Sequence, residues 1–336
     1  MKLIIPMAGR GTRVRPHSHV TPKPLLSVRG MSIVERIVDT FSASIDVSID
    51  TGVFVLGPDF GQAIRDQLTE ICAAHDMTAE FAVQEQALGT AHAVGSAGHH
   101  LEGSGIVVFA DTLFGMDDQT VLDPDADVTM WVREVEDPSR FGVAVREGER
   151  VVRLVEKPDE PISNEAIIGI YHVRDLARLH QEIEYLIEHN IRGKGDEYQL
   201  TDAFDRMLQD GAVFKTASVD AWMDCGTIPS LLETTQRVLK REPDEAVQGT
   251  VTDSVVHEPV YIGPGATVEN AVIGPNVSIE AGATVRGSVV RDSILFAEST
   301  VENAVLADSI VGQHATVDPE ASVVNVGDHS YVGPRS

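Results

Sequence analysis

Glycine, arginine and lysine residues gather in one stretch near the start of the chain. It reads AGRGTRVRPHSHVTPKPLL over residues 8–26, and its chemically useful members are Gly9, Gly11, Arg13, Arg15 and Lys23. Glycines let backbone N–H groups approach phosphate oxygens, because no Cβ stands in the way. Arginine and lysine side chains would add positive charge beside the same anion. The stretch therefore predicts a phosphate-binding loop, although it has neither the GK[ST] ending of a P-loop nor the GxGxxG spacing.

The elements around this loop must hold it at the edge of a sheet. The apolar run Leu3–Ile5 reads as a buried strand, and a helix is predicted to begin just before Glu35, which completes a capping box. Strands and helices then alternate as far as about Lys240, which is typical of an α/β domain with a mainly parallel sheet. Ligands bind at the carboxyl ends of strands in such sheets. The loop, Gln84 and Asp111 are therefore expected to line one crevice. The predicted strands are 52–56, 80–84, 105–110, 128–132, 142–146, 151–155, 166–172 and 213–218, and the predicted helices are 59–75, 91–100, 176–189, 197–209 and 227–240.

The composition changes beyond residue 240. Residues 241–252 are polar and contain a proline, so we expect a linker between one domain at 1–240 and another at 253–334. Aliphatic residues then recur near every sixth position, as in IGPGAT, IGPNVS and IEAGAT, and these repeats resemble those of left-handed parallel β-helices. A sandwich of antiparallel strands is the alternative, but hairpin turns do not explain a six-residue step. Because such coils tend to associate side by side, we expect a homo-oligomer through the β-helix.

The balance of charge limits the partners. The 336 residues include 26 basic and 52 acidic ones, a net charge of −26, so we expect no nucleic acid and no membrane as a partner. The first apolar run is broken by Pro6 too soon for a signal peptide. Cys72 and Cys225 provide no disulfide framework, which fits a cytoplasmic protein, and Cys225 is expected to pack rather than to act as a nucleophile. Only 6 of the basic residues are lysine, which fits a high-salt cytoplasm and an ordinary acidic protein about equally well.

The first loop resembles the GGxGTRxxPxTxxxPK pattern of the sugar-phosphate nucleotidyltransferases, also called NDP-sugar pyrophosphorylases. Ala8 replaces the first glycine of that pattern, and Ser18 replaces its threonine. The resemblance implies that Arg13 and Lys23 hold the phosphates of a nucleoside triphosphate. It also implies a Rossmann-like α/β nucleotidyltransferase domain at 1–240, with a mainly parallel mixed sheet, followed by a left-handed parallel β-helix. The positions of nucleotide-binding residues in this loop are taken by Ala8, Gly9, Gly11 and Thr12.

Two further segments resemble the base and metal sites of that family. QEQALGTAHA, residues 84–93, matches the segment in which an amide side chain and a backbone N–H read the nucleobase, with Gln84 and Gly89 in those positions. An amide offers a donor and an acceptor group, which suits the imide edge of thymine or uracil. Asp111 resembles the metal aspartate, and Asp224 in WMDCGT matches its partner in the WxDxGT motif. Two carboxylates with triphosphate oxygens suit Mg²⁺, which keeps water in its remaining positions.

The sugar side is implied by RFGVAV, EKP, IIGIY and GDEYQLTDA. A carboxylate that accepts sugar hydroxyls discriminates strongly, because a missing hydroxyl leaves a buried charge unpaired. The alternative is that the EKP segment carries a solvated hairpin ion pair. By resemblance, the residue that contacts the sugar is Gly142, those that accept its hydroxyls are Glu156 and Glu197, the one that binds its phosphate is Lys157, and the one that lines its pocket is Gly169.

The resemblance implies nucleotidyl transfer from an NTP to a sugar 1-phosphate, which gives an NDP-sugar and pyrophosphate. Arg13, Lys23 and Lys157 are the expected catalytic cations. The pair dTTP or UTP with glucose 1-phosphate is favoured, as in the thymidylyltransferases that carry a C-terminal β-helix. Mannose-1-phosphate guanylyltransferase, or another pair of NTP and sugar, remains an alternative. So do a non-catalytic subunit that senses nucleotide sugars and a bifunctional acyltransferase with His257, His314 or His329 as base.

Overall fold

The computed structural model describes residues 1–9, 11–116 and 120–319. The chain divides into two compact units that do not follow its order. The first unit comprises Met1–Gly9, Ile37–Ala110 and Phe114–Trp222, and the second comprises Arg10–Arg36, Asp111–Leu113 and Met223–Ser336. Most of residues 8–26, here called the phosphate loop, thus belongs to the second unit together with the C-terminal part of the chain. Within the described ranges, no helix is long and apolar enough to cross a membrane.

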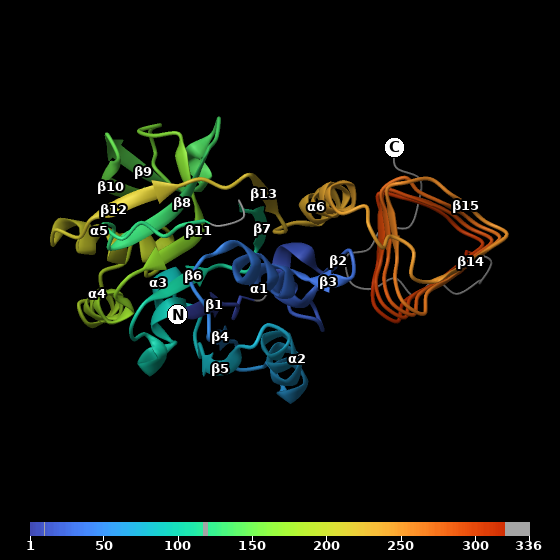
Figure 1. Ribbon diagram of the computed structural model, residues 1–336, viewed down its shortest axis with the longest axis horizontal. Helices are drawn as coiled ribbons and strands as arrows, with labels where there is room; N and C mark the ends of the chain where they lie inside the picture. The colour runs from blue at the N-terminus through green and yellow to red at the C-terminus, as the bar shows by residue number, and fades with distance from the viewer. Residues whose placement is uncertain (10, 117–119, 320–336) are drawn as a thin grey trace. The chain divides into compact units, whose positions relative to one another are not determined.

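A nine-stranded sheet forms the centre of the first unit (Figure 1). Its strands lie in the order β5-β4-β1-β6-β11-β8-β12-β10-β9. Their bounds are β1 Lys2–Pro6, β4 Thr51–Leu56, β5 Thr78–Val83, β6 Gly105–Val108, β8 Val128–Glu134, β9 Gly142–Glu147, β10 Arg150–Glu156, β11 Glu165–Val173 and β12 Phe214–Ala217. The strands β5, β4, β1 and β6 run parallel, as the alternation of strands and helices predicts.

The other half of this sheet is mostly antiparallel. Strand β11 runs antiparallel to β6 and β8, and β10 runs antiparallel to β9 and β12. The chain passes from β8 through β9 and β10 to β11 without an α-helix, and such short connections favour antiparallel neighbours. The sheet is therefore mixed, with a larger antiparallel share than the sequence pattern predicts.

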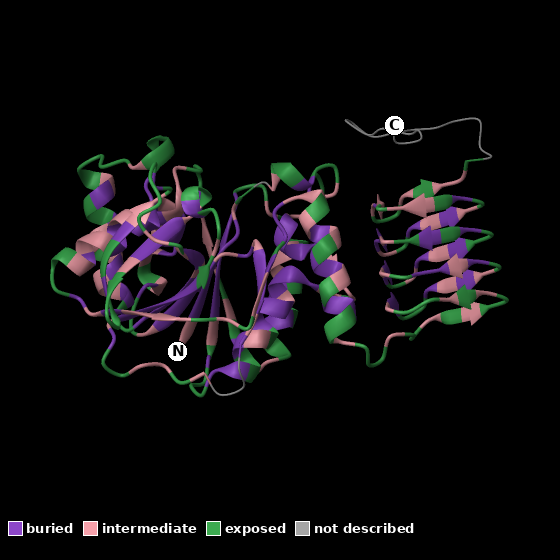
Figure 2. Cartoon of the chain, turned by 90° about the horizontal axis from the view of Figure 1, so that it is seen from above, coloured by how far each residue is buried: buried purple, intermediate pink, exposed green. Residues whose placement is uncertain are grey.

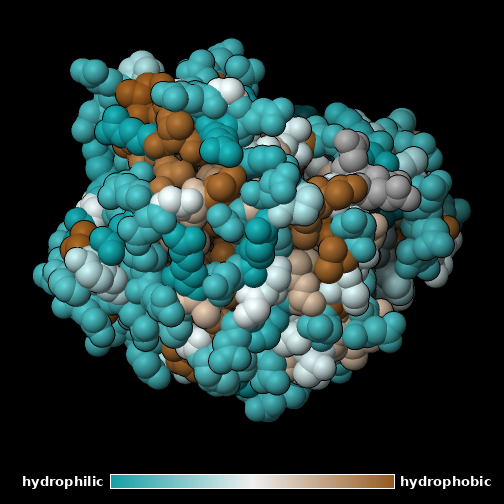
Figure 3. Space-filling model, turned by 60° about the vertical axis from the view of Figure 1, so that its left-hand side comes forward, coloured by the Kyte–Doolittle hydropathy of each residue, from teal (hydrophilic) through white to brown (hydrophobic). Residues whose placement is uncertain are grey.

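Buried aliphatic side chains hold the helices of this unit against the sheet. These helices are α2 Gln62–Ala73, α3 Thr90–Gly95, α4 Leu176–Glu188 and α5 Leu200–Gln209. Ile4, Val107 and Leu179 are fully buried members of one core cluster, and Figure 2 shows that most strand residues are buried. Hydrophilic side chains dominate the face drawn in Figure 3, in keeping with the 52 acidic residues of the chain. The apolar core of this unit thus lies beneath a surface that is mainly, though not entirely, hydrophilic.

The second unit begins with the phosphate loop and a short hairpin. The loop contains the 3₁₀ turns η1 Thr12–Val14 and η2 Lys23–Leu25, and the hairpin consists of β2 Ser27–Val28 and β3 Met31–Ser32. Helix α1, Ile33–Ser44, follows with the predicted capping box: the Ser32 N–H donates to the Glu35 carboxylate, and the Glu35 N–H donates to the Ser32 hydroxyl, both at 3.2 Å. Farther along the chain lie β7 Thr112–Gly115, which pairs with β13 Ala221–Asp224, and helix α6 Ile228–Arg241.

The repeats form a parallel β-helix. Its three ladders are β14-β17-β20-β23-β26, β15-β18-β21-β24 and β16-β19-β22-β25. Successive coils align Val268, Val285 and Val301, which are all fully buried, so the six-residue pattern correctly predicts the inner column of the helix. The strand bounds are β14 Thr250–Thr252, β15 Val255–Val256, β16 Val260–Ile262, β17 Thr267–Glu269, β18 Val272–Ile273, β19 Val277–Ile279, β20 Thr284–Arg286, β21 Val289–Arg291, β22 Ser293–Leu295, β23 Thr300–Glu302, β24 Val305–Ala307, β25 Ile310–Val311 and β26 Thr316–Val317.

The stacked sheets confirm the predicted fold class, an α/β domain followed by a left-handed β-helix. His257 and His314 are exposed in the turns of this helix. Both His329 and the predicted end of the helix at residue 334 lie outside the described residues.

Candidate active site

The phosphate loop is held by contacts among its own residues. Gly11 has a φ of +55°, and a Cβ there would lie 2.8 Å from the Cβ of Lys23, so glycine is required at this left-handed position. The Ser18 hydroxyl donates to the Gly11 carbonyl at 2.6 Å. Thr12 and Arg13 lie in η1, and Lys23 begins η2. The loop therefore fixes the backbone from which both predicted cations extend.

Lys23 lies next to one of the predicted metal aspartates. Its Nζ is 3.7 Å from Oδ2 of Asp111. The side chain of Lys23 is only 10% exposed, whereas that of Asp111 is 47% exposed. The cation is thus held within the protein, while the carboxylate still reaches solvent. Such a pair can meet a ligand that carries both phosphate oxygens and a divalent cation.

Asp224 and Arg13 both lie against Gly226. The Gly226 N–H donates to Oδ1 of Asp224 at 2.9 Å. A Cβ on Gly226 would lie 2.8 Å from that oxygen and 3.3 Å from Nη2 of Arg13, so the glycine leaves room for both groups. The Cys225 N–H donates to the Asp111 carbonyl at 3.0 Å, which joins the segments that carry the two aspartates. The second unit thus brings together four predicted site residues, Arg13, Lys23, Asp111 and Asp224.

Cys225 lies in this cluster but is unsuited to nucleophilic chemistry. Its side chain is fully buried, and burial is the main reason why the pKa of its thiol is raised to about 12. A thiol with so high a pKa stays protonated near neutral pH and is a poor nucleophile. Cys225 therefore acts as a packing residue, as the sequence suggests.

The donor set of the cluster fits Mg²⁺ that binds together with a nucleotide. Across the described residues, no group of three or more His, Cys, Asp or Glu side chains could hold a metal ion by itself. Asp111 and Asp224 supply hard oxygen ligands, and phosphate oxygens would supply others. Mg²⁺ usually binds through one or two carboxylates plus substrate phosphates, with water in the remaining positions.

The predicted base-reading amide, Gln84, follows β5 directly in the first unit. The residue is 6% exposed, and its Nε2 lies 3.0 Å from Nδ1 of His92. An amide nitrogen can only donate, so Nδ1 is the acceptor and His92 is neutral in this arrangement. Burial lowers the pKa of His92, which also favours the neutral ring. The Oε1 atom of Gln84 is consequently the end of the amide that remains available as an acceptor.

Gly89 and Glu197 lie side by side in the same unit. Gly89 has a φ of +121°, and a Cβ there would lie 2.7 Å from the Tyr198 nitrogen and 2.9 Å from the Glu197 Cβ. The Tyr198 N–H donates to the Leu88 carbonyl at 2.9 Å, so this segment is extended. The helix predicted from residue 197 therefore begins only at Leu200, and Glu197 lies in front of it.

Gly142 and Glu156 form a second contact in the first unit. They pair across β9 and β10, and a Cβ on Gly142 would lie 2.9 Å from Oε2 of Glu156. Thr201 donates its hydroxyl to the same oxygen at 2.8 Å, and Lys157 Nζ lies 3.4 Å from Oε1. The Glu156 side chain is 15% exposed, which argues against a solvated hairpin pair. Sequence reasoning missed Thr201, although it lies within GDEYQLTDA, the segment singled out for Glu197.

The remaining predicted residues have simpler surroundings. Gly169 has a φ of +80° where the pairing of β11 with β8 shifts register, and a Cβ there would lie 3.2 Å from Cδ2 of Phe109. Ala8 and Gly9 follow β1, and an added Cβ at Gly9 would meet no atom within 4 Å. The left-handed backbone and the nearby Phe109 ring therefore require a residue without a Cβ at 169, whereas the space beside Gly9 is open for a ligand.

Comparisons with known proteins identify the family. A nucleotidyl transferase model matches residues 2–241, and a model described as the GMPPB C-terminal domain matches residues 256–334. The chain is 28% identical to a glucose-1-phosphate thymidylyltransferase of Streptomyces antibioticus over 100% of both chains. It is 30% identical to the low-salt glycan biosynthesis nucleotidyltransferase Agl11 of Haloferax volcanii, across 75% of this chain and 70% of that relative.

A solved structure supports the same fold. The structure of UDP-glucose pyrophosphorylase complexed with UDP-glucose matches with a TM-score of 0.58 at 23% identity, over 71% of this chain and 98% of that chain. The family model covers well over half of the 336 residues and includes Arg13, Lys23, Asp111 and Asp224. The chain therefore belongs to the nucleotidyl transferase family of NDP-sugar pyrophosphorylases and is a sugar-1-phosphate nucleotidyltransferase.

Proposed function

We propose that this enzyme transfers the nucleotidyl group of dTTP or UTP to glucose 1-phosphate and releases pyrophosphate. The contact between Gln84 and His92 is the observation that favours a base with a ring N–H. With its nitrogen engaged by His92, the amide presents Oε1, which can accept the ring N–H of thymine or uracil. Adenine and cytosine have an unprotonated ring nitrogen at the corresponding edge, and that nitrogen cannot donate a hydrogen bond to this oxygen.

Guanylyl transfer to mannose 1-phosphate is the second candidate. Guanine also carries a ring N–H, so the free oxygen of Gln84 suits it as well. The full-length similarity to a glucose-1-phosphate thymidylyltransferase favours the pyrimidine and glucose 1-phosphate.

The reaction requires no general base. An oxygen of the sugar 1-phosphate is already ionised at neutral pH and attacks the α-phosphorus of the NTP. The bond from that phosphorus to the bridging oxygen breaks, and pyrophosphate leaves with the electron pair. Catalysis then consists of positioning the two phosphates in line and neutralising their charge.

The cations have distinct roles in this mechanism. We assign Arg13 to the charge that develops around the reacting phosphates, and Lys23 to binding of the triphosphate. Lys157, 45% exposed beside Glu156, would align the phosphate of the incoming sugar. Ala8, Gly9, Gly11 and Thr12 would form the backbone of the nucleotide site. We assign the sugar hydroxyls and pocket to Gly142, Glu156, Gly169 and Glu197, and the nucleobase to Gln84 and Gly89.

Mg²⁺ is the proposed cofactor. Asp111 and Asp224 would hold it, and the bound ion would supply positive charge to the phosphate oxygens. The protein's own contribution is to leave the carboxylate of Asp111 able to bind the ion. The Lys23 contact of 3.7 Å with Asp111 is long for an ion pair, so this carboxylate can still bind a metal.

The β-helix has a surface suited to self-association. Four valines stack in register along one of its outer ladders, Val255, Val272, Val289 and Val305. Three of them are clearly exposed, Val255 at 53%, Val289 at 41% and Val305 at 81%. A row of outward valines is costly in water, and a second copy of the chain would cover it with the same row. We therefore propose a homo-oligomer in which these ladders meet.

A substrate matrix tests the proposed reaction. Purified enzyme is incubated with each of dTTP, UTP, GTP, ATP and CTP against glucose 1-phosphate, mannose 1-phosphate and their N-acetylamino analogues, and pyrophosphate release is measured. The proposal expects the highest kcat/KM for dTTP or UTP with glucose 1-phosphate. A clear preference for GTP would select the second candidate, and a preference for ATP or CTP would contradict the assigned role of Gln84.

A further inference from the structure

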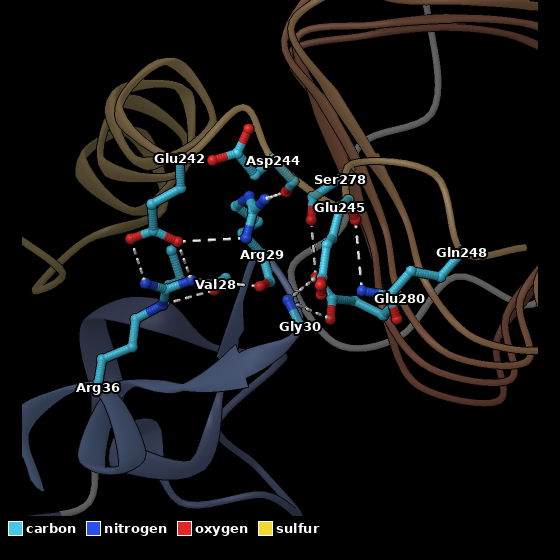
Figure 4. A network of polar contacts seen from close by, with 10 residues as sticks. All are labelled: Val28, Arg29, Gly30, Arg36, Glu242, Asp244, Glu245, Gln248, Ser278 and Glu280. Atoms are coloured by element: carbon cyan, nitrogen blue, oxygen red, sulfur yellow. Dashed lines mark hydrogen bonds and ion pairs between the residues drawn. The ribbon is translucent and has the colours of Figure 1, made fainter. Parts of the chain in front are cut away.

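A buried carboxylate of the β-helix reaches the hairpin that follows the phosphate loop (Figure 4). Glu280 lies just after β19 and is only 3% exposed. Its Oε2 accepts the Ser27 hydroxyl at 2.6 Å and the Gly30 N–H at 3.0 Å, and its Oε1 accepts the hydroxyl of Ser278 at 2.7 Å. Two of these three donors come from the hairpin, some 250 residues away in sequence.

A carboxylate in this position has no obvious value for folding of the β-helix alone. The core cluster of the coils consists of aliphatic residues such as Ile279, whereas a buried charge needs donors to offset its desolvation. Burial raises the pKa of Glu280, and the hydrogen bonds from Ser27, Ser278 and Gly30 together with the charge of Arg36 oppose that rise. The group is therefore satisfied only when the hairpin is docked.

Gly30 allows the hairpin to approach this closely. It has a φ of +81°, and a Cβ there would lie 2.6 Å from Cζ of Tyr261 on strand β16. Tyr261 is 6% exposed, and the guanidinium of Arg29 lies 5.5 Å from its ring centre. An ion pair also joins helix α1, which follows the hairpin, to the residue after α6, where Arg36 Nη1 lies 2.8 Å from Oε1 of Glu242. These contacts hold the backbone of the hairpin in one position against the β-helix.

The hairpin residue Ser27 follows Lys23 closely along the chain. The Leu26 N–H donates to the Lys23 carbonyl at 3.0 Å, and Ser27 is the next residue. The middle of the phosphate loop also touches the β-helix, because His17 packs edge-on against Phe296 with ring centres 5.7 Å apart. The β-helix therefore contacts the chain on both sides of Lys23, at His17 before it and at Ser27 and Gly30 after it.

We infer that Glu280 is a positioning residue for nucleotide binding, through which the β-helix holds the phosphate loop and its Lys23 in the orientation that receives the triphosphate. The inference rests on the proposed role of Lys23 and adds to it a function for the β-helix in the reaction itself. A truncation after Lys240 removes Glu280, so the shortened enzyme should bind NTP more weakly.

The test compares kinetics and stability of full-length variants. Each is assayed with the NTP and the sugar 1-phosphate that the wild-type enzyme uses best, so the result does not depend on which base is preferred. Glu280→Ala should raise the KM for NTP about tenfold or more, because a small displacement of a positioning group is enough for such a loss. The KM for the sugar 1-phosphate should stay near the wild-type value, and so should the Tm of the β-helix.

Two further variants separate positioning from bulk structure. In Glu280→Gln the amide nitrogen can donate to the Ser27 oxygen, while the amide oxygen takes the place of Oε1, which lies 3.3 Å from the Gly30 nitrogen, so the KM for NTP should return to within about threefold of wild type. Glu302→Ala is the matched control, since its carboxylate pairs with Arg286 at 3.2 Å on an exposed ladder and should change neither KM. Equal increases in both KM values for Glu280→Ala would overturn the inference, as would an unchanged KM for NTP.

Ser27→Ala approaches the same contact from the loop side. It removes one donor to Glu280 without placing a new group in the β-helix. It should raise the KM for NTP in the same direction, and the double variant with Glu280→Ala should show less than the product of the two single effects. If Glu280→Ala does not fold, this variant decides the matter, and an unchanged KM for NTP in Ser27→Ala contradicts the inference.

Discussion

Nε2 of Gln84 and Nδ1 of His92 lie 3.0 Å apart, and this contact determines which end of the amide is free. Gln84 N–H also donates to the Leu56 carbonyl at 2.8 Å, so the backbone of Gln84 is fixed by the neighbouring strand β4. The proposed base-reading residue is therefore held at both its backbone and its side chain. We propose that a neutral histidine in this place acts on base choice through the amide.

Replacing His92 should weaken discrimination among bases. In His92→Leu the amide can rotate and present either its oxygen or its nitrogen, so kcat/KM for the preferred imide NTP should fall about tenfold while that for CTP falls less. His180→Leu is the matched control, because His180 and His92 line one surface pocket, but His180 pairs with Glu184 instead of Gln84. Unchanged ratios of kcat/KM between dTTP, UTP and CTP in His92→Leu would contradict this role.

The same contact predicts a pH dependence of base choice. Burial lowers the pKa of His92 from its usual 6.5, so the ring is neutral at pH 7 and becomes charged only as the pH falls below that value. The charged ring donates from Nδ1, which forces the amide to turn its oxygen toward His92. The kcat/KM ratio of dTTP or UTP to CTP should therefore decrease below pH 6.5. In His92→Leu the ratio should be constant over the same range.

The sequence predicts which residues meet around Asp111 and Asp224 better than it predicts the strand directions of the sheet. Asp111 and Asp224 are 113 positions apart, yet each lies in a short motif with its own turn chemistry, so their meeting can be expected from the motifs alone. The antiparallel half of the sheet depends on which strands pair, and pairing between distant strands leaves no local signal. Thr201 beside Glu156 and Glu280 beside Ser27 are likewise long-range contacts, and the residue types involved are common on surfaces.

Neutralising the aspartates tests the metal site. Asp111→Asn and Asp224→Asn should each lower kcat by orders of magnitude, because the amide is a far weaker ligand for Mg²⁺. Stability should stay near wild type, since Asp111 is 47% exposed and an asparagine at 224 can still accept the Gly226 N–H. Excess EDTA should abolish turnover of the wild type, and added Mg²⁺ should restore it. Full activity of both variants would remove the two residues from the site.

The valine ladder makes oligomerisation testable without touching the reaction. Val305→Asp places a charge on a residue that is 81% exposed in the chain, so the fold should tolerate it while a valine-to-valine interface should not. We expect a lower mass in multi-angle light scattering and unchanged kcat. Val152→Asp is the control, because Val152 is 43% exposed in the first unit, outside the β-helix. An unchanged mass for Val305→Asp, or a reduced mass for the control, would contradict association through this ladder.

The two cations of the phosphate loop should differ in the kinetic constant that they affect. Arg13→Ala removes a forked donor that we place at the charge of the transition state, so kcat should fall about 10²–10³-fold, equivalent to roughly 2–4 kcal/mol. For Lys23 the informative change is Lys23→Met, because the Cβ and Cγ that pack close to Gly11 are retained while the ammonium group is lost. A lysine binds phosphate as a point charge in ground and transition states alike, so this variant should mainly raise the KM for NTP. The measurement is a pair of steady-state profiles with saturating sugar 1-phosphate. If Arg13→Ala changed only KM and left kcat intact, the arginine would be a binding residue, and stabilisation of the transition state would have to come from another group.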